Sequence, residues 1–303
     1  MSNGGPVLVV GGTGLLGGKV VAALQGKGKP VRALVRPGSD ATGLQDAGVE
    51  VVRGDMMDLE SLLRAMGGAD AVITSAAGYT RHSKGDTAAI DITGNANLAE
   101  AAARSGVRRF VLTSILTCDQ TPGVPHFWHK RLAEDRLEDL QVPFVALRPG
   151  AFLDTVARFG GDPFAKRRLA WFGSDQVPMT FVLTSDLAGY LASAVDADVA
   201  PGTRIDIGWD RPVSMHEIAD IAGRLLGERI SVRSVPAGLL RGAGRVLGSA
   251  VPMARDMSAM IDWFQTGNYV ADTARQREVF GPPPTAEDAV ARFLTQLGHT
   301  VRQ

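Results

Sequence analysis

The stretch that most constrains this chain is VLVVGGTGLLG, at residues 7–17. Apolar residues lead directly into a glycine-rich turn, and Leu16, Val20, Val21 and Leu24 then recur at the spacing of one helix face. A strand, a glycine turn and a helix in this order are typical of the corner where a doubly wound sheet binds phosphate groups. We therefore expect this part of the chain to form a βαβ unit of a parallel sheet.

Each glycine of the turn has its own physical role. Gly11 at the strand end allows a positive φ, Gly14 lets a diphosphate approach the backbone, and Gly17 lets the helix pack close to the strand. The N–H groups and the dipole at the helix start attract anions. Glycine triplets also occur in plain β–α turns of a chain with 36 glycines, but the flanking strand and helix favour a dinucleotide site.

The end of the next predicted strand, residues 30–36, indicates which dinucleotide fits. A site for NAD usually carries Asp or Glu about 20 residues after the glycine turn, whereas this chain has Arg36. A guanidinium binds a 2′-phosphate through paired hydrogen bonds, and a carboxylate repels it. The sequence thus favours NADP, with NADPH as the reduced form, over NAD. The alternative for Arg36 is a solvated surface side chain.

Two further predicted strands, at residues 49–53 and 70–74, end in side chains suited to the rest of a dinucleotide. Asp55 is placed to accept a hydrogen bond from an adenine amino group, with Met56 against the ring, or else Asp55 serves a simple turn or cap. The later strand is followed by small residues against which a cofactor can lie: Ala76, Ala77 and Gly78. The polar loop 79–86 comes next and either reaches the ligand or lies on the surface.

Strands at residues 108–114 and 142–147 and helices at 88–105 and 125–137 extend the alternating pattern. The pattern predicts an α/β fold, a Rossmann-type doubly wound parallel sheet with helices on both faces. Within the helix at 125–137, His126 and Lys130 are four residues apart and therefore share one face.

The two halves of the chain differ in regularity. We expect an NADP-binding domain over residues 1–152 and, over 153–303, a smaller C-terminal substrate cap, part of which returns to the main sheet. The second half contains possible strands at 177–183 and 230–235 and a possible helix at 237–247. Its large apolar residues either line a substrate pocket or form ordinary core: Trp171, Phe172, Trp209, Met253, Met257, Met260, Trp263 and Phe264.

Composition and charge argue against several classes of function. The 32 basic and 32 acidic residues balance, which disfavours partners such as nucleic acid or an anionic membrane. The apolar runs are shorter than a membrane span needs. The single cysteine, Cys118, excludes an internal disulfide, and the five histidines lack metal-ligand spacing. We expect a cytoplasmic monomer or homodimer that acts on a small-molecule substrate and holds no metal.

Taken together, these residues resemble the short-chain dehydrogenase/reductase superfamily in its atypical, NmrA-like branch, which includes isoflavone-reductase-like and triphenylmethane-reductase-like proteins. The matching pieces are the glycine turn at 11–17, LVR at 34–36, GDMMD at 54–58, Lys130 with Glu134, RPGAF at 148–152 and FGPPPT at 280–285.

The resemblance implies a role for each matching residue. The pyrophosphate would lie on Thr13, Gly14, Leu15, Leu16 and Gly17, and Gly11 would belong to the same cofactor-binding site. Arg36 would hold the 2′-phosphate, and Asp55 and Met56 would meet the adenine. Residues 76–78 would contact the central ribose, and Lys130 the hydroxyls of the nicotinamide ribose. The nicotinamide would be flanked by Pro149, Ala151 and Phe152.

The chain departs from the wider superfamily at its catalytic residues. Members of the superfamily use Tyr-x-x-x-Lys, in which the tyrosine donates a proton. If Lys130 is the family lysine, His126 stands in place of the tyrosine. A serine usually follows the fifth strand, but Ile115 takes that position, and Ser114 is one residue early and faces the other way. The resemblance therefore implies an incomplete catalytic triad.

Three functional hypotheses follow. The first is an NADPH-dependent oxidoreductase that transfers hydride to a conjugated acceptor, such as a quinone, an enone or a dye-like compound, with solvent or His126 supplying the proton. His126 is otherwise a surface side chain at a helix start. The second is an NmrA-like redox sensor or regulator that binds NADP without turnover. The third is a nucleotide-sugar epimerase or dehydratase, although that chemistry depends on the missing tyrosine.

Overall fold

The computed structural model describes residues 4–78, 88–156, 161–236 and 252–302. The predicted loop 79–86 and helix 237–247 lie outside these residues. The chain divides into two compact units. The first comprises residues 1–119, 125–148 and 185–205, and the second comprises residues 120–124, 149–184 and 206–303.

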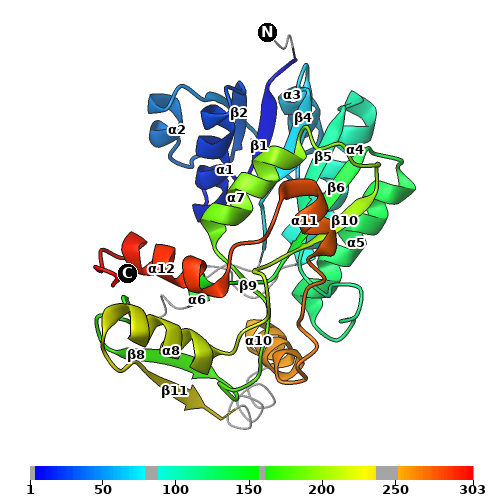
Figure 1. Ribbon diagram of the computed structural model, residues 1–303. Coiled ribbons are helices and arrows are strands. Elements are labelled where there is room, and N and C mark those ends of the chain that lie inside the picture. The colour runs from blue at the N-terminus through cyan, green and yellow to red at the C-terminus, as the bar shows by residue number, and fades with distance from the viewer. Residues whose placement is uncertain (1–3, 79–87, 157–160, 237–251, 303) are drawn as a thin grey trace. The chain divides into compact units, whose positions relative to one another are not determined.

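A seven-stranded sheet with the order β10-β6-β5-β4-β1-β2-β3 is the centre of the first unit (Figure 1). Its strands are β1 (Val7–Val10), β2 (Val31–Val35), β3 (Glu50–Arg53), β4 (Ala71–Thr74), β5 (Arg109–Thr113), β6 (Phe144–Pro149) and β10 (Thr203–Ile207). β1 pairs in parallel with both β2 and β4, so the strand order reverses at β1. The predicted Rossmann-type α/β fold is confirmed.

Helices cover both faces of this sheet, as a parallel sheet requires. They are α1 (Leu15–Gly26), α2 (Thr42–Asp46), α3 (Leu59–Met66), α4 (Asn95–Ser105), α5 (Pro125–Asp139) and α7 (Thr184–Ala194). α3, α4 and α5 pack against one face, and Figure 1 shows α1 and α7 on the other. Asp58 caps α3, because its carboxylate accepts hydrogen bonds from the N–H groups of Glu60 and Ser61.

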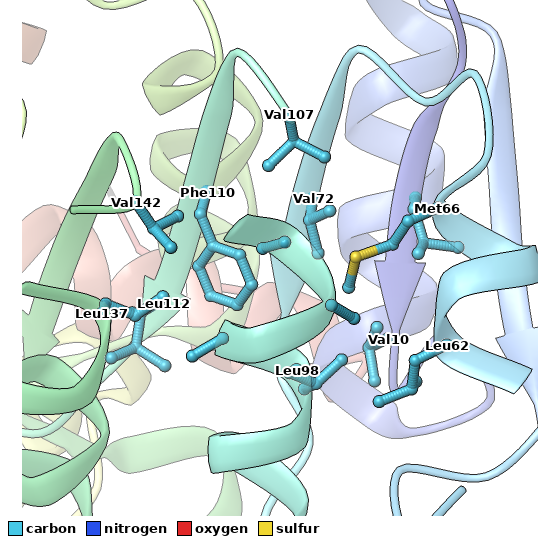
Figure 2. Close-up of a cluster of buried hydrophobic side chains, with 14 of the residues drawn as sticks. Val10, Leu62, Met66, Val72, Leu98, Val107, Phe110, Leu112, Leu137 and Val142 are labelled. Carbon is cyan, nitrogen blue, oxygen red and sulfur yellow. The ribbon is translucent and has the colours of Figure 1, made fainter. Parts of the chain in front are cut away.

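The core between the sheet and α3, α4 and α5 is built from alternate strand residues (Figure 2). Val10, Val72 and Phe110 come from three neighbouring strands, and Leu62 and Leu98 meet them from α3 and α4. Every residue of β1 and β4 is buried. A strand that is apolar along its whole length must be covered on both faces, which is why the continuous apolar runs in the sequence predicted a parallel sheet.

One predicted helix has an irregular first turn. Residues expected to form a single helix from 88 to 105 form a π-helical segment, η1 (Ala89–Gly94), followed by α4. A π-helical turn holds one extra residue, and such turns are frequent at functional sites. Asp91 lies on this turn and is only 1 % exposed.

The second unit contains two small parallel sheets and several helices. Its elements are β7 (Ala151–Phe152), α6 (Leu153–Val156), β8 (Arg168–Phe172), β9 (Phe181–Val182), α8 (Met215–Leu226), β11 (Ser231–Val235), α10 (Pro252–Phe264), α11 (Ala274–Phe280) and α12 (Ala286–Gln296). β7 pairs with β9, and β8 pairs with β11. The strand predicted at 177–183 is shorter than expected. The strand predicted at 230–235 is β11, and its partner β8 was not predicted.

The large aromatic residues of the second unit fall into two groups. Trp171, Phe181 and Trp209 pack together in the core, with ring centroids about 6 Å apart. Phe172 is 37 % exposed. On α10, Met257, Met260, Trp263 and Phe264 are half-buried. Core packing therefore accounts for Trp171 and Trp209, which the sequence left open between pocket and core.

None of the helices in the described part of the chain is long and apolar enough to cross a membrane. The described residues also hold no group of His, Cys, Asp and Glu side chains arranged to bind a metal ion.

Candidate functional site

The glycine turn follows β1, at the point where the strand order of the sheet reverses. Ligands of doubly wound folds bind at such a switch point, beyond the carboxyl ends of the strands. Gly11 has a φ of 91°, a conformation that favours glycine. The Gly11 carbonyl accepts a hydrogen bond of 2.9 Å from the Gly14 N–H, which closes the turn. The two predicted functions of Gly11, a tight turn and a positive φ, are thus both present.

Gly17 brings the start of α1 against this turn. A Cβ atom at residue 17 would lie 2.0 Å from the Gly11 carbonyl oxygen, far inside van der Waals contact. α1 begins at Leu15 with no side-chain cap and no acidic residue in its first turn. The first N–H groups of a helix lack intrahelical partners. The exposed edge formed by Thr13, Gly14 and Leu15 is therefore suited to an anion.

An open pocket of about 340 Å³ adjoins the glycine turn. The turn contributes one wall of this pocket, and the segment between β2 and α2 contributes another. The lining residues are Gly12, Thr13, Gly14, Gly18, Val21, Ala22, Gln25, Asp40, Ala41, Gly43, Leu44 and Ala47. We call this the turn pocket.

Arg36 directly follows β2 and is exposed. Within the described residues its guanidinium makes no hydrogen bond or ion pair, so it is available to a ligand. Its backbone is held in place, because Arg53 donates to the carbonyl oxygens of Arg36 (3.1 Å) and Ser39 (2.6 Å). The backbone of the loop that carries Arg36 is therefore held by Arg53, and the guanidinium of Arg36 has no bond to another described residue.

The structure separates the two residues predicted to meet an adenine. The Asp55 carboxylate accepts a hydrogen bond from the Met57 N–H at 2.9 Å, so the turn role that the sequence allowed is present. Met56 is 7 % exposed and belongs to the core. Met57 is 46 % exposed and has the surface that a ring could contact. Adenine binding by Asp55 and Met56 stays a prediction, and Met57 fits the predicted contact better than Met56.

Residues 76–78 are held from two sides. Lys130 on α5 donates from Nζ to the Ala76 carbonyl oxygen at 3.1 Å. The Gly78 N–H donates to Asp91 Oδ1 at 3.0 Å, and the same oxygen lies 3.7 Å from Lys130 Nζ. Ala77, between these contacts, is exposed. The structure thus brings Lys130 to the loop that the sequence predicted to contact the ribose.

His126 lies one helical turn before Lys130 on α5. It is 7 % exposed, and its ring stands edge-on to Phe127 with the centroids 4.7 Å apart. The interpretation of His126 as a surface side chain is therefore wrong. A role for it in proton transfer stays a prediction.

A buried cluster of charges lies below this face of α5. Arg148 grips Glu134 through two hydrogen bonds, from Nε (2.9 Å) and Nη2 (2.6 Å). Ser114 donates to Glu134 at 2.6 Å, and Arg204 donates to it at 2.9 Å. Arg148 also bonds to Asp119 at 2.7 Å. Glu134 is fully buried, so every one of these contacts compensates for its lost hydration.

The charges of this cluster shift each other's protonation. Burial raises the pKa of Glu134, but the hydrogen bonds and charge of Arg148 outweigh burial and hold the pKa below the ordinary 4.5. A carboxylate with a depressed pKa stabilises the fold above its unfolded-state pKa, and this contribution is lost as pH falls through the folded-state pKa. Burial, followed by the charge of Glu134, raises the pKa of the Cys118 thiol to about 12, so Cys118 is an inert thiol.

The residues predicted to flank a nicotinamide lie in the second unit. The Ala151 N–H donates to the Thr180 carbonyl at 2.9 Å, and a Cβ on Gly150 would lie 2.4 Å from the same oxygen. The Tyr269 hydroxyl donates to the Pro149 carbonyl at 3.4 Å. Ala151 and Phe152 are partly exposed. Proximity of Pro149, Ala151 and Phe152 to a nicotinamide stays a prediction.

Sequence reasoning missed Asp91 and Tyr269. Asp91 gave one weak signal, because it is an acidic residue in the helix predicted at 88–105, which also carries the apolar residues Ile90 and Leu98. Tyr269 gave none, because it is 120 residues away from Pro149 in the chain. Contacts between segments so distant in sequence cannot be found from local periodicity.

Comparison with known proteins identifies the family to which this chain belongs. The model of the NmrA-like family matches residues 4–301. The chain belongs to the NmrA-like family. Among curated proteins, it is 28% identical over 235 residues to the photosystem II assembly factor Ycf39 of Synechocystis sp., which covers 78% of this chain and 72% of that protein.

Solved structures share the fold over nearly the whole chain. The Citrobacter sp. triphenylmethane reductase, in complex with NADP(H), has a TM-score of 0.77 and 22% identity, and the match covers 95% of this chain and 100% of that one. An NADPH-dependent quinone oxidoreductase of Escherichia coli has a TM-score of 0.75 and 18% identity over 95% of this chain and 99% of that one. At these identities the likeness establishes the fold alone.

Replacement of Gly17 by alanine tests the close approach of α1 to the glycine turn. We expect Gly17→Ala to lower the free energy of unfolding by about 1–3 kcal/mol, because the new Cβ overlaps the Gly11 carbonyl. Gly18→Ala is the matched control, since its Cβ would meet nothing closer than 3.8 Å, and it should raise stability by about 0.5–1 kcal/mol. Denaturant unfolding measures both. Equal effects of the two variants would contradict this account of Gly17.

Replacement of Arg148 by methionine tests the buried cluster. We expect Arg148→Met to lower the free energy of unfolding by about 3–5 kcal/mol, because Glu134 stays buried without its main partner. Much of the loss should return in the double variant Glu134→Leu/Arg148→Met. Arg136→Met, which breaks an exposed ion pair between Arg136 on α5 and Glu100 on α4, should cost less than about 1 kcal/mol. A loss from Arg148→Met no larger than that control would show that the cluster is unimportant.

Proposed function

We propose that this protein binds NADPH at the glycine turn and reduces a small conjugated acceptor, such as a quinone, an enone or a dye-like compound. The observation that carries the proposal is the uncapped start of α1 beside Arg36, at the switch point of the sheet. The close approach at Gly17 leaves backbone N–H groups for a diphosphate. Membership of the NmrA-like family and the fold shared with NADP(H)-bound reductases support the proposal.

Two residues of the first unit, Arg36 and Lys130, fit different parts of the coenzyme. The guanidinium of Arg36, which bonds to none of the described residues, is suited to the 2′-phosphate of NADPH, a group that NADH lacks. Lys130, fixed by the Ala76 carbonyl and Asp91, retains donors for ribose hydroxyls because an ammonium group carries three. When bound, NADPH supplies a hydride. These residues hold and orient it.

The acceptor class follows from the side chains that are missing. A ketone needs a positioned acid to protonate the developing alkoxide, but Ser114 is committed to Glu134 and no tyrosine stands at the position of His126. Conjugated or cationic acceptors delocalise the electrons that they receive, and water can protonate the product. His126, which shares a helix face with Lys130 by its spacing of four residues, is the alternative proton donor. The same argument disfavours an epimerase or dehydratase.

A second function, binding of the nucleotide without turnover, is supported by a different observation. The Synechocystis relative is named an assembly factor rather than a reductase. In that case the nucleotide would act as a redox signal, and the residues of the glycine turn and Arg36 would have the same roles.

Charge reversal at Arg36 tests the coenzyme. We expect Arg36→Asp to weaken NADPH binding at least about tenfold, because a charge-assisted contact with the 2′-phosphate is replaced by repulsion. NADH binding should be unchanged. Arg64→Asp, at an exposed arginine on α3, is the matched control and should alter neither affinity. Titration of each nucleotide by calorimetry measures the effect. An equal loss for NADPH and NADH would reject the assigned role of Arg36.

Turnover separates the two functions. We expect the protein to consume NADPH with at least one member of a panel of quinones, enones and triphenylmethane dyes. The loss of NADPH absorbance measures this consumption. If His126 donates the proton, His126→Ala should lower the rate about 10²-fold or more without changing the affinity for NADPH. Unchanged rates would leave water as the donor. Tight NADPH binding with no turnover across the panel would reject the reductase in favour of the sensor.

A further inference from the structure

The turn pocket carries a negative charge, whereas the phosphate groups of NADPH are best bound by positive charge. Of its twelve lining residues, all within the described part of the chain, Asp40 alone is charged. Arg36 and Arg53 belong to the same β2–α2 neighbourhood but are not among the lining residues. A ligand that enters the pocket from the glycine turn therefore faces a carboxylate on the opposite wall.

The Asp40 carboxylate is held in position. Its Oδ1 accepts hydrogen bonds from the Thr42 N–H at 2.9 Å and from the Thr42 hydroxyl at 2.7 Å, which is an arrangement typical of the start of a helix. These bonds favour the charged form and lower the pKa of Asp40 below its ordinary 3.8. The preceding loop is fixed by Arg53 through the carbonyl oxygens of Arg36 and Ser39. The negative charge is thus a permanent feature of the wall.

The position of the pocket relates it to the 2′-phosphate. β1 and β2 are neighbouring parallel strands, so the glycine turn after β1 and Arg36 after β2 meet at one edge of the sheet. With the pyrophosphate on the glycine turn and the 2′-phosphate on Arg36, the adenosine ribose would lie at this edge of the sheet, between the ends of β1 and β2. Thr13 and Asp40 line the same pocket.

We infer that Asp40 is a specificity-determining residue that opposes Arg36, so that this chain discriminates only weakly between NADPH and NADH. The inference rests on the proposed function, because it takes the glycine turn as the nucleotide site. Specificity is a difference between two affinities. Repulsion of a group that only one of the two ligands carries lowers the affinity for that ligand alone. The 2′-phosphate carries close to two negative charges at neutral pH, whereas the 2′-hydroxyl of NADH is neutral. Asp40 therefore lowers the affinity for NADPH and leaves that for NADH unaffected.

The test compares Asp40→Asn with Asp46→Asn. The asparagine at residue 40 keeps an acceptor oxygen for Thr42 and removes only the charge. Asp46 lies on α2, is exposed and does not line the pocket, so its replacement makes the same change in net charge elsewhere. Calorimetric titration of the full chain with NADPH and with NADH, at low and at high salt, gives four dissociation constants for each protein.

We expect Asp40→Asn to tighten NADPH binding about threefold at low salt, to leave NADH binding unchanged, and to lose most of its effect at high salt. Asp40→Lys, which reverses the charge, should tighten NADPH binding about tenfold. Asp46→Asn should change neither constant. Equal changes for NADPH and NADH, no change at low salt, or an equal effect of Asp46→Asn would each overturn the role of Asp40. If the unaltered protein binds neither nucleotide, the proposed function itself fails, and the two failures are thereby distinguished.

Discussion

The buried pair of Glu134 and Arg148 is the interaction on which the candidate site depends most. Glu134 follows Lys130 by one helical turn on α5, and Arg148 lies in β6. Ser114, just after β5, and Arg204 in β10 donate to the same carboxylate. One carboxylate therefore joins α5 to the ends or edges of three strands. Because a bidentate guanidinium bond has little angular freedom, this pair fixes the rotation of α5 about its axis and with it the direction of Lys130.

The same cluster occupies the hydroxyl of Ser114. A serine hydroxyl near the end of the fifth strand is available for catalysis only if it faces the ligand. The Ser114 hydroxyl instead donates to a fully buried carboxylate. Its removal would leave Glu134 with one partner fewer in a region without water, so Ser114 is committed to stability. The hydroxyl of Ser114 is thus part of the buried charge cluster, and the next residue, Ile115, carries no hydroxyl.

Local patterns in the sequence predicted the fold, the glycine turn and the helix face shared by His126 and Lys130. The glycine turn could be predicted because Gly11 and Gly17 act on each other over six residues, within one strand–turn–helix unit. The placement of Lys130 and His126 on one face of α5 followed from their helical spacing. Asp91 and Tyr269 could not be predicted, because their contacts with Lys130 and Pro149 join segments far apart in the chain. The burial of Met56 and the exposure of Met57 could not be predicted either, because a shift of one residue changes which side chain faces the core.

Asp91 shows how the remaining charges restrict the chemistry. Its carboxylate is 1 % exposed, and Oδ2 has no hydrogen-bond partner within the described residues. Among the described residues, Lys130 forms an ion pair with it at 3.7 Å. A buried carboxylate so close offsets much of the positive field of the ammonium group. In the wider superfamily that field makes a tyrosine more acidic, but here no tyrosine stands on the same face of α5. A lysine whose field is offset by a neighbouring carboxylate can orient a ligand hydroxyl but polarises a nearby proton donor only weakly. The Asp91–Lys130 pair and the absence of a tyrosine from α5 are therefore consistent with each other.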